Sequence, residues 1–217
     1  MKTKTTILNR LFKSKTAALA ALAFAALACT PTLARDKDDD EIKFNLVRNT
    51  QFDKTNPNFA PNARGRVKIE SVGPVEIMDV KVEGLPPNTD FDFFVIQIPH
   101  APFGLAWYQG DIETDSHGVG HGRFIGRFNI ETFIVATASA PAPVVFNDPS
   151  FPDAPSNPPT NPVQLYHLGL WFNSPQDAVN AGGPPNVTPF NGEHHAGVQV
   201  LNTSNFTDDF GPLRPQP

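Results

Sequence analysis

Histidines gather in two glycine-rich stretches of the chain and could bind a metal. His117 and His121 flank the turn in "TDSHGVGHGRF", and the distant stretch "NGEHHAG" supplies Glu193, His194 and His195. Imidazole nitrogens together with a carboxylate are a common ligand set for zinc, copper or iron. If the two loops converge, these residues form a metal site. The alternative is that they are exposed loop residues that bind nothing.

The glycines of the first stretch indicate a hairpin and exclude a phosphate-binding loop. A dinucleotide fingerprint needs a third glycine at position 123, and the Gly-Lys-Ser/Thr of a Walker loop is absent. We expect antiparallel strands over 111–114 and 121–128, with Gly118 and Gly120 at positive φ in the turn between them. Two registers set acidic residues against arginines: Glu113 opposite Arg123, or Asp111 opposite Arg127 and Asp115 opposite Arg123.

Three large aromatic residues could form a platform for sugar rings. Trp107 and Tyr108 lie in "FGLAWYQGD", and Trp171 lies in "YHLGLWF". The alternative role of these rings is packing in the core. No catalytic motif accompanies them: the Gly-x-Ser-x-Gly elbow is absent, and Ser116 has only its chain neighbours as partners, whose side chains point apart. The sequence therefore assigns no catalytic residue.

Short stretches of alternating apolar and polar residues predict an all-β fold of antiparallel strands. Further strands are expected at 43–49, 66–72, 75–84, 91–98, 163–172 and 196–202. The stretch 91–98, "FDFFVIQI", is apolar at almost every position, which favours a strand covered on both faces. One short helix is expected after Ser174, because serine caps helices and Pro175 fits the first helical position. The proline-rich stretch 141–162 predicts a long surface loop.

Five residues in "VKVEGLPPNTDFDFFVI" form a corner motif: Gly84, Leu85, Pro87, Thr89 and Phe91. The motif resembles the corner of fibronectin type III and related immunoglobulin-like sandwiches, where the chain turns from one sheet into the next. Those families have tyrosine where this chain has Phe91, so the corner hydroxyl hydrogen bond cannot form. The resemblance implies a single-domain antiparallel β-sandwich. The chain as a whole also resembles uncharacterised secreted bacterial proteins, which implies no function.

The N-terminal residues predict bacterial export. In 1–34, five basic residues precede a short apolar run that is well below the ~20 residues of a membrane span, so we expect a signal peptide cleaved after Ala34. Lipidation at Cys29, the chain's single cysteine, is the alternative. An acidic disordered linker, 35–42, then precedes one domain, 43–217. We expect a secreted or periplasmic protein.

Net charge narrows the range of partners. The chain carries a net charge of −5, which becomes −10 once the five basic residues of the signal peptide are removed. This sign argues against nucleic acid and anionic membranes as partners. We expect a non-catalytic binding or structural module with a cell-envelope or extracellular partner. A metal-binding protein or metalloenzyme and a carbohydrate-binding module are the alternatives.

Overall fold

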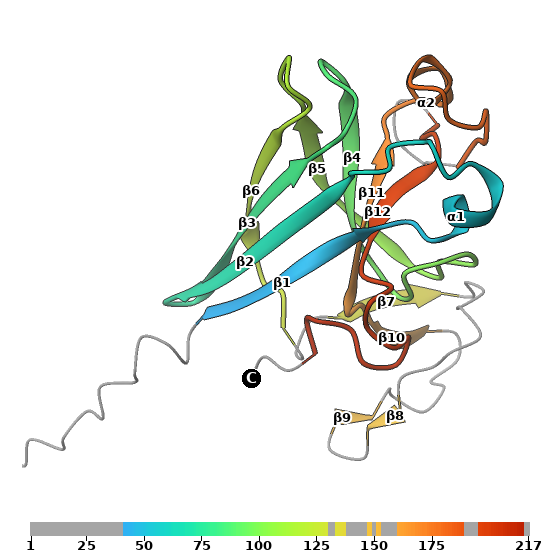
Figure 1. Cartoon of the computed structure of the whole chain (residues 1–217). Coiled ribbons are helices and arrows are strands. Elements are labelled where there is room, and N and C mark those ends of the chain that lie inside the picture. Colours follow the sequence, from blue (N-terminus) through green and yellow to red (C-terminus); the bar gives the residue numbers. More distant parts are fainter. Residues whose placement is uncertain are drawn as a thin grey trace, which may run out of the picture. The chain divides into compact units, whose positions relative to one another are not determined.

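Figure 1 shows the computed structural model of the chain. It describes residues 41–129, 133–137, 147–148, 151–152, 160–188 and 195–214. The predicted signal peptide (1–34) and Cys29, together with Glu193 and His194, lie outside the described residues. Of the predicted acidic linker 35–42, the structure describes only the last two residues, which already belong to the first strand.

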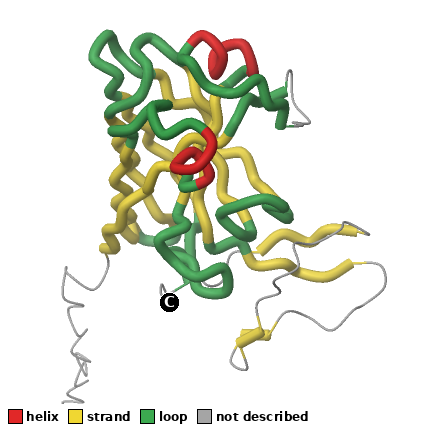
Figure 2. The backbone as a smooth tube through the Cα atoms, turned by 45° about the vertical axis from the view of Figure 1, so that its right-hand side comes forward, coloured by secondary structure: helices red, strands yellow, loops and turns green. Residues whose placement is uncertain are grey.

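Eight antiparallel strands form one continuous sheet (Figure 1). They are β1 (Glu41–Arg48), β2 (Arg64–Val72), β3 (Val75–Glu83), β4 (Asp90–Ile96), β5 (Ala106–Glu113), β6 (Gly120–Gly126), β11 (His167–Phe172) and β12 (Gln199–Asn202). Their order across the sheet is β5-β4-β11-β12-β1-β2-β3-β6. The sheet curls (Figure 2), so that its two edge strands, β5 and β6, approach each other. They meet at a bridge between Thr114 and Gly120. The result is a nearly closed barrel.

The predicted all-β antiparallel class is confirmed, but the described strands do not form the two separate sheets of an immunoglobulin-like sandwich. The reason is β1, which pairs with β12 on one side and β2 on the other and so joins the two halves into a single ladder. The corner from Gly84 to Phe91 does carry the chain across the fold, because it connects β3 to β4, which are not neighbours in the sheet. Phe91 is fully buried where the families have tyrosine.

The core lies inside the curled sheet and follows the alternation of the sequence. On β3, where apolar and polar residues alternate, the apolar residues Met78, Val80 and Val82 are all buried. On β4, every residue from Phe91 to Ile96 is buried, which confirms that this strand is covered on both faces. Its outward face packs in a second, smaller apolar cluster with Trp171 of β11.

The predicted pairing of the glycine-rich hairpin is wrong. Apart from the Thr114–Gly120 bridge, β5 pairs with β4 and β6 pairs with β3, so Arg123 lies opposite Asp79. The two strands separate after their turn because side chains fill the space between them. Phe124 of β6 reaches over Gly110 of β5 and stacks on Phe93, with ring centroids 5.2 Å apart. A Cβ on Gly110 would lie 3.1 Å from the Phe124 ring.

Two short helices accompany the sheet. The predicted helix is α2 (Pro175–Asn180), capped by Ser174 Oγ, which accepts from the backbone N–H of Asp177 at 3.1 Å. The other, α1 (Gln51–Thr55), falls in a stretch without helical periodicity. Tertiary packing stabilises it, since the buried ring of Phe52 packs edge-on against Phe59 at 5.0 Å. Neither helix, nor any other within the described residues, has the length and apolar character of a membrane span.

Four further short strands lie outside the main sheet: β7 (Phe133–Thr137) pairs with β10 (Thr160–Gln164), and β8 (Asn147–Asp148) pairs with β9 (Phe151–Pro152). The last three overlap the proline-rich stretch 141–162, which was predicted to be a loop. The predicted strand 163–172 is divided between β10 and β11 by the buried residues Leu165 and Tyr166.

Candidate ligand-binding site

A groove with a volume of about 560 Å³ lies where the barrel stays open. Because β5 and β6 meet only at Thr114 and Gly120, they diverge toward the start of β5 and the end of β6. We call this opening the seam groove. Its lining residues are Val95, Trp107, Gln109, Ile125, Gly126, Arg127, Phe128, Phe133, Ile134 and Leu165.

Exposed apolar side chains from three strands form the walls of the seam groove. Trp107 of β5 is 58% exposed, Ile125 of β6 is 68% exposed and Phe133 of β7 is 52% exposed. Trp107 lies opposite the core residue Val95 on β4, so its ring is on the inner side of the sheet. It remains exposed because β6 has diverged from β5 at this level. Aromatic rings left in water beside a concave surface are typical of ligand sites.

The floor of the seam groove is part of the core and is held rigidly. Val95, Phe128 and Leu165 are all buried. The buried carboxylate of Glu76 accepts hydrogen bonds from the backbone N–H of Phe128 and, at 2.8 Å, from Nδ2 of Asn129. These bonds fix the chain just after β6, which forms one rim. A floor of this kind gives a ligand a preformed surface.

Few polar groups reach the seam groove. Gln109 is half-buried at the bulge between β4 and β5, where Phe93 opposes Gly110 and Phe94 opposes Tyr108. Arg127 is exposed, and its Nη1 donates to the carbonyl oxygen of Pro74 at 3.3 Å. The groove therefore combines a wide apolar surface with an amide and a guanidinium that can form hydrogen bonds.

The structure separates the three aromatic residues that the sequence grouped. Tyr108 packs on Phe94, with ring centroids 5.5 Å apart, and Phe94 in turn contacts Trp171. Trp171 is 3% exposed, so it has the core role that was the alternative prediction. The Tyr108 hydroxyl donates to Asp111, and partial burial together with this bond raises the pKa of Tyr108 above its usual range. Of these three aromatic residues, only Trp107 lines the seam groove.

Part of the predicted metal site lies outside the described residues, namely Glu193 and His194. His117 extends into solvent from the β5–β6 turn, with 84% of its side chain exposed. His121 lies on the exposed face of β6, and His195 is also exposed. No three histidine, cysteine or carboxylate side chains come together to hold a metal ion within the described part of the chain. The metal site therefore stays a prediction.

Sequence reasoning did not include Ile125 and Phe133 in any site. The sequence does indicate that Ile125 is exposed, because it is an apolar residue on a strand face that otherwise carries His121, Arg123 and Arg127. For Phe133 we find no local signal, since its exposure depends on how β7 lies beside the barrel.

No family model matches the chain, and no curated protein aligns with it. The structure defines the class, a mostly β chain whose antiparallel eight-stranded sheet is nearly closed into a barrel. Any functional assignment therefore depends on the geometry of its surface.

Proposed function

We propose that this chain is an exported, non-catalytic module that binds a glycan in the seam groove. The observation that carries the proposal is the pair of exposed aromatic rings, Trp107 and Phe133, in one groove. Sugar rings have apolar C–H faces that pack on indole and phenyl rings, and large amphipathic aromatic residues dominate binding energy at many interfaces. The hydroxyl groups at the sugar's edge need polar partners, which Gln109 and Arg127 supply.

Binding without cleavage fits the lining of the seam groove. Glycoside hydrolysis uses two carboxyl groups on opposite sides of the scissile bond. The described residues that line the groove include no aspartate or glutamate. Glu76 is not among the lining residues, and its buried carboxylate accepts hydrogen bonds from Phe128 and Asn129 just after β6.

Export is the second part of the proposal and depends on the first 34 residues. Their basic start, short apolar run and small residues before the expected cleavage point are typical of a signal peptide. An exported binding module meets glycans in the cell envelope or outside the cell. We therefore expect a polysaccharide of the envelope or the surroundings to be the partner.

The test is retention of the purified chain by insoluble cellulose, chitin and xylan and by a soluble β-glucan in affinity gels. We expect at least one to retain the chain and Trp107→Ala to weaken that retention at least tenfold. Phe210→Ala is the matched control, because Phe210 is also an exposed aromatic residue, 45% exposed, but does not line the groove. Equal loss in both variants, no retention by any of these glycans, or release of reducing sugar would contradict the proposal.

A further inference from the structure

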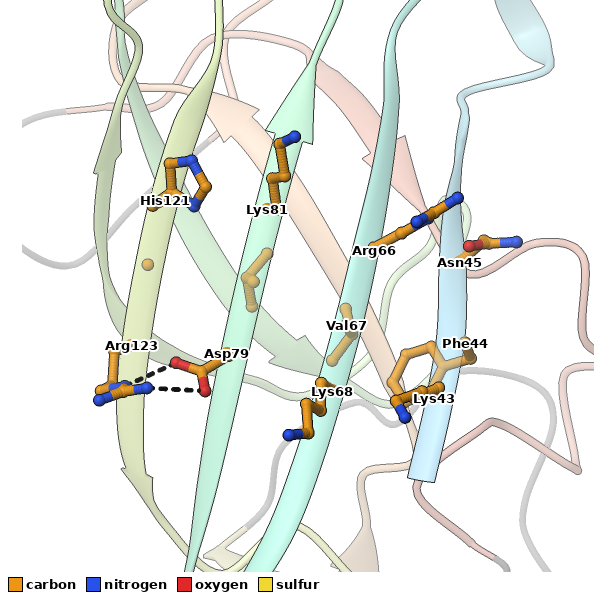
Figure 3. A pocket seen from close by; sticks show the side chains of 12 residues that line it. Lys43, Phe44, Asn45, Arg66, Val67, Lys68, Asp79, Lys81, His121 and Arg123 are labelled. Atoms are coloured by element: carbon orange, nitrogen blue, oxygen red, sulfur yellow. Dashed lines mark hydrogen bonds and ion pairs between the residues drawn. The ribbon is translucent and has the colours of Figure 1, made fainter. Parts of the chain in front are cut away.

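A second hollow, with a volume of about 750 Å³, lies over the outer face of β1, β2, β3 and β6 (Figure 3). Two rows of side chains cross the four strands and wall it. One row consists of Asn45, Arg66, Lys81 and His121, and the other of Lys43, Lys68, Asp79 and Arg123. We call this hollow the basic groove.

The strand register brings these side chains into line. Arg66 on β2 lies directly opposite Lys81 on β3, and Lys81 lies opposite His121 on β6. Neighbouring strands are about 4.8 Å apart, so one row spans roughly 14 Å across four strands. Between the two rows, the side chains of Val67 and Val80 are buried in the core.

The walls of the basic groove carry five lysine and arginine residues against one carboxylate, that of Asp79. Carboxylates of the flanking rows, those of Glu41, Glu70 and Glu83, offset most of this excess. Four of the five cations have acidic partners: Lys43 pairs with Glu41, Lys68 with Glu41 at 2.8 Å and Glu70 at 2.5 Å, Lys81 with Glu83 at 3.6 Å, and Arg123 with Asp79 at 2.6 Å. The carboxylates of Glu41 and Glu70 raise the pKa of the Lys68 ammonium group and keep it charged.

Arg66 differs from the other cations of the basic groove. It is exposed in the middle of its row, and no carboxylate within the described residues pairs with it. Its row holds no acidic residue at all: Asn45, Lys81 and His121 are its members. An arginine with an unoccupied planar fork beside a lysine is suited to a carboxylate or sulfate from outside the chain.

We propose that the basic groove binds an acidic polysaccharide, a linear glycan that carries carboxylate or sulfate groups. The unpaired guanidinium of Arg66 argues for an anionic ligand, and the lysine and arginine side chains on all four strands lie where a glycan chain that carries an anionic group on successive sugars would run. A nucleic acid fits less well, because proteins that bind single strands alternate cations with exposed aromatic rings. The one phenyl ring that lines the groove, Phe44, packs edge-on against Phe206.

The experiment measures electrophoretic retardation of the purified chain in gels that contain dextran sulfate, polygalacturonate or uncharged dextran. We expect retardation by at least one of the two polyanions and none by dextran, with the effect falling steeply as salt rises. Arg66→Glu should weaken binding at least tenfold. Lys54→Glu is the matched control, because it makes the same charge change at an exposed residue of α1, away from the groove.

Three outcomes would overturn the basic-groove proposal. The first is absence of polyanion binding, and the second is equal weakening by Arg66→Glu and Lys54→Glu, which would indicate a general charge effect. The third is binding of a single-stranded oligothymidylate as tightly as either polyanion. Trp107→Ala should leave polyanion binding unchanged, because Trp107 does not line the basic groove. The failure of one proposal is therefore separable from the failure of the other.

Discussion

Arg123 on β6 lies directly opposite Asp79 on β3 and forms a two-pronged ion pair with it. Nε donates to Oδ1 at 2.6 Å, and Nη2 donates to Oδ2 at 2.9 Å. This pair locks the edge strand β6 onto β3 along the exposed face of the sheet, and the Arg123 guanidinium lowers the pKa of the Asp79 carboxyl group. Arg123 therefore helps to fix the register between β6 and β3, and it also lines the basic groove.

Replacing Arg123 tests how much the Arg123–Asp79 ion pair contributes to the stability of the fold. We expect Arg123→Gln to lower the thermal midpoint by roughly 1–3 °C at pH 7, since exposed ion pairs stabilise folds only weakly. Because the pKa of Asp79 is lower in the folded chain than in the unfolded chain, where it is about 4, the ion pair stabilises the fold at pH values above 4. This stabilisation is lost as the pH falls through the pKa that Asp79 has in the folded chain. The difference between variant and parent should therefore vanish near pH 2. Calorimetry at both pH values measures it, and a difference that persists in acid would show that Arg123 acts through packing.

We expect the fold to lose stability in mild acid because His167 on β11 is fully buried. The Nδ1 of His167 lies 2.8 Å from Thr203 Oγ1, and its Nε2 lies 3.2 Å from the carbonyl oxygen of Asp208. Since a carbonyl only accepts, Nε2 carries the proton and Nδ1 accepts from the hydroxyl. Burial lowers the pKa of His167 to about 4. The unfolded chain, with a histidine pKa near 6.5, therefore binds a proton more readily than the folded chain.

Stability should consequently fall as the pH drops from about 6.5 to about 4, by at most about 3 kcal/mol from this residue. Urea unfolding at pH 7 and pH 4.5 measures the loss, and His167→Gln should reduce it. His100→Gln is the control, because His100 is 53% exposed and pairs with Asp208 at 2.9 Å. If both variants show the same pH dependence as the parent, buried His167 is not responsible.

Gly118 in the β5–β6 turn cannot accept a side chain. Its φ is +71°, and a Cβ would lie 2.0 Å from the carbonyl oxygen of Leu85 in the corner between β3 and β4. The Leu85 N–H also donates to the Gly118 carbonyl at 3.3 Å, so the turn and the corner are in direct contact. We expect Gly118→Ala to cost about 3 kcal/mol or more, because the clash adds to the backbone strain.

Gly73 provides the matched comparison for this substitution. Its φ is +61°, but its Cβ would meet no atom within 4 Å, so Gly73→Ala should cost only about 1 kcal/mol of backbone strain. Chemical denaturation of the two variants measures the difference. Equal costs would mean that the close approach of the corner to the turn adds nothing to the strain.

Local features of the sequence were sufficient wherever a short stretch decides its own structure. The alternation on β3, the apolar run of β4 and the cap at Ser174 were predicted because burial and capping depend on neighbours a few residues away. The positive φ of Gly118 was predicted on the same ground. Gly120 was expected to share it, yet it is needed for another reason: a Cβ there would lie 2.8 Å from Ile112. That contact comes from packing between strands, which the turn alone does not define.

By itself, then, the sequence determined an antiparallel β fold and most of its strands. Only the tertiary structure decided that Arg123 pairs with Asp79, that one sheet nearly closes, and that Trp107 is exposed while Trp171 is buried. The physical reason is that pairing and exposure depend on which distant strands become neighbours. Both grooves are assembled from strands brought together in that way, so their composition follows from strand order and register.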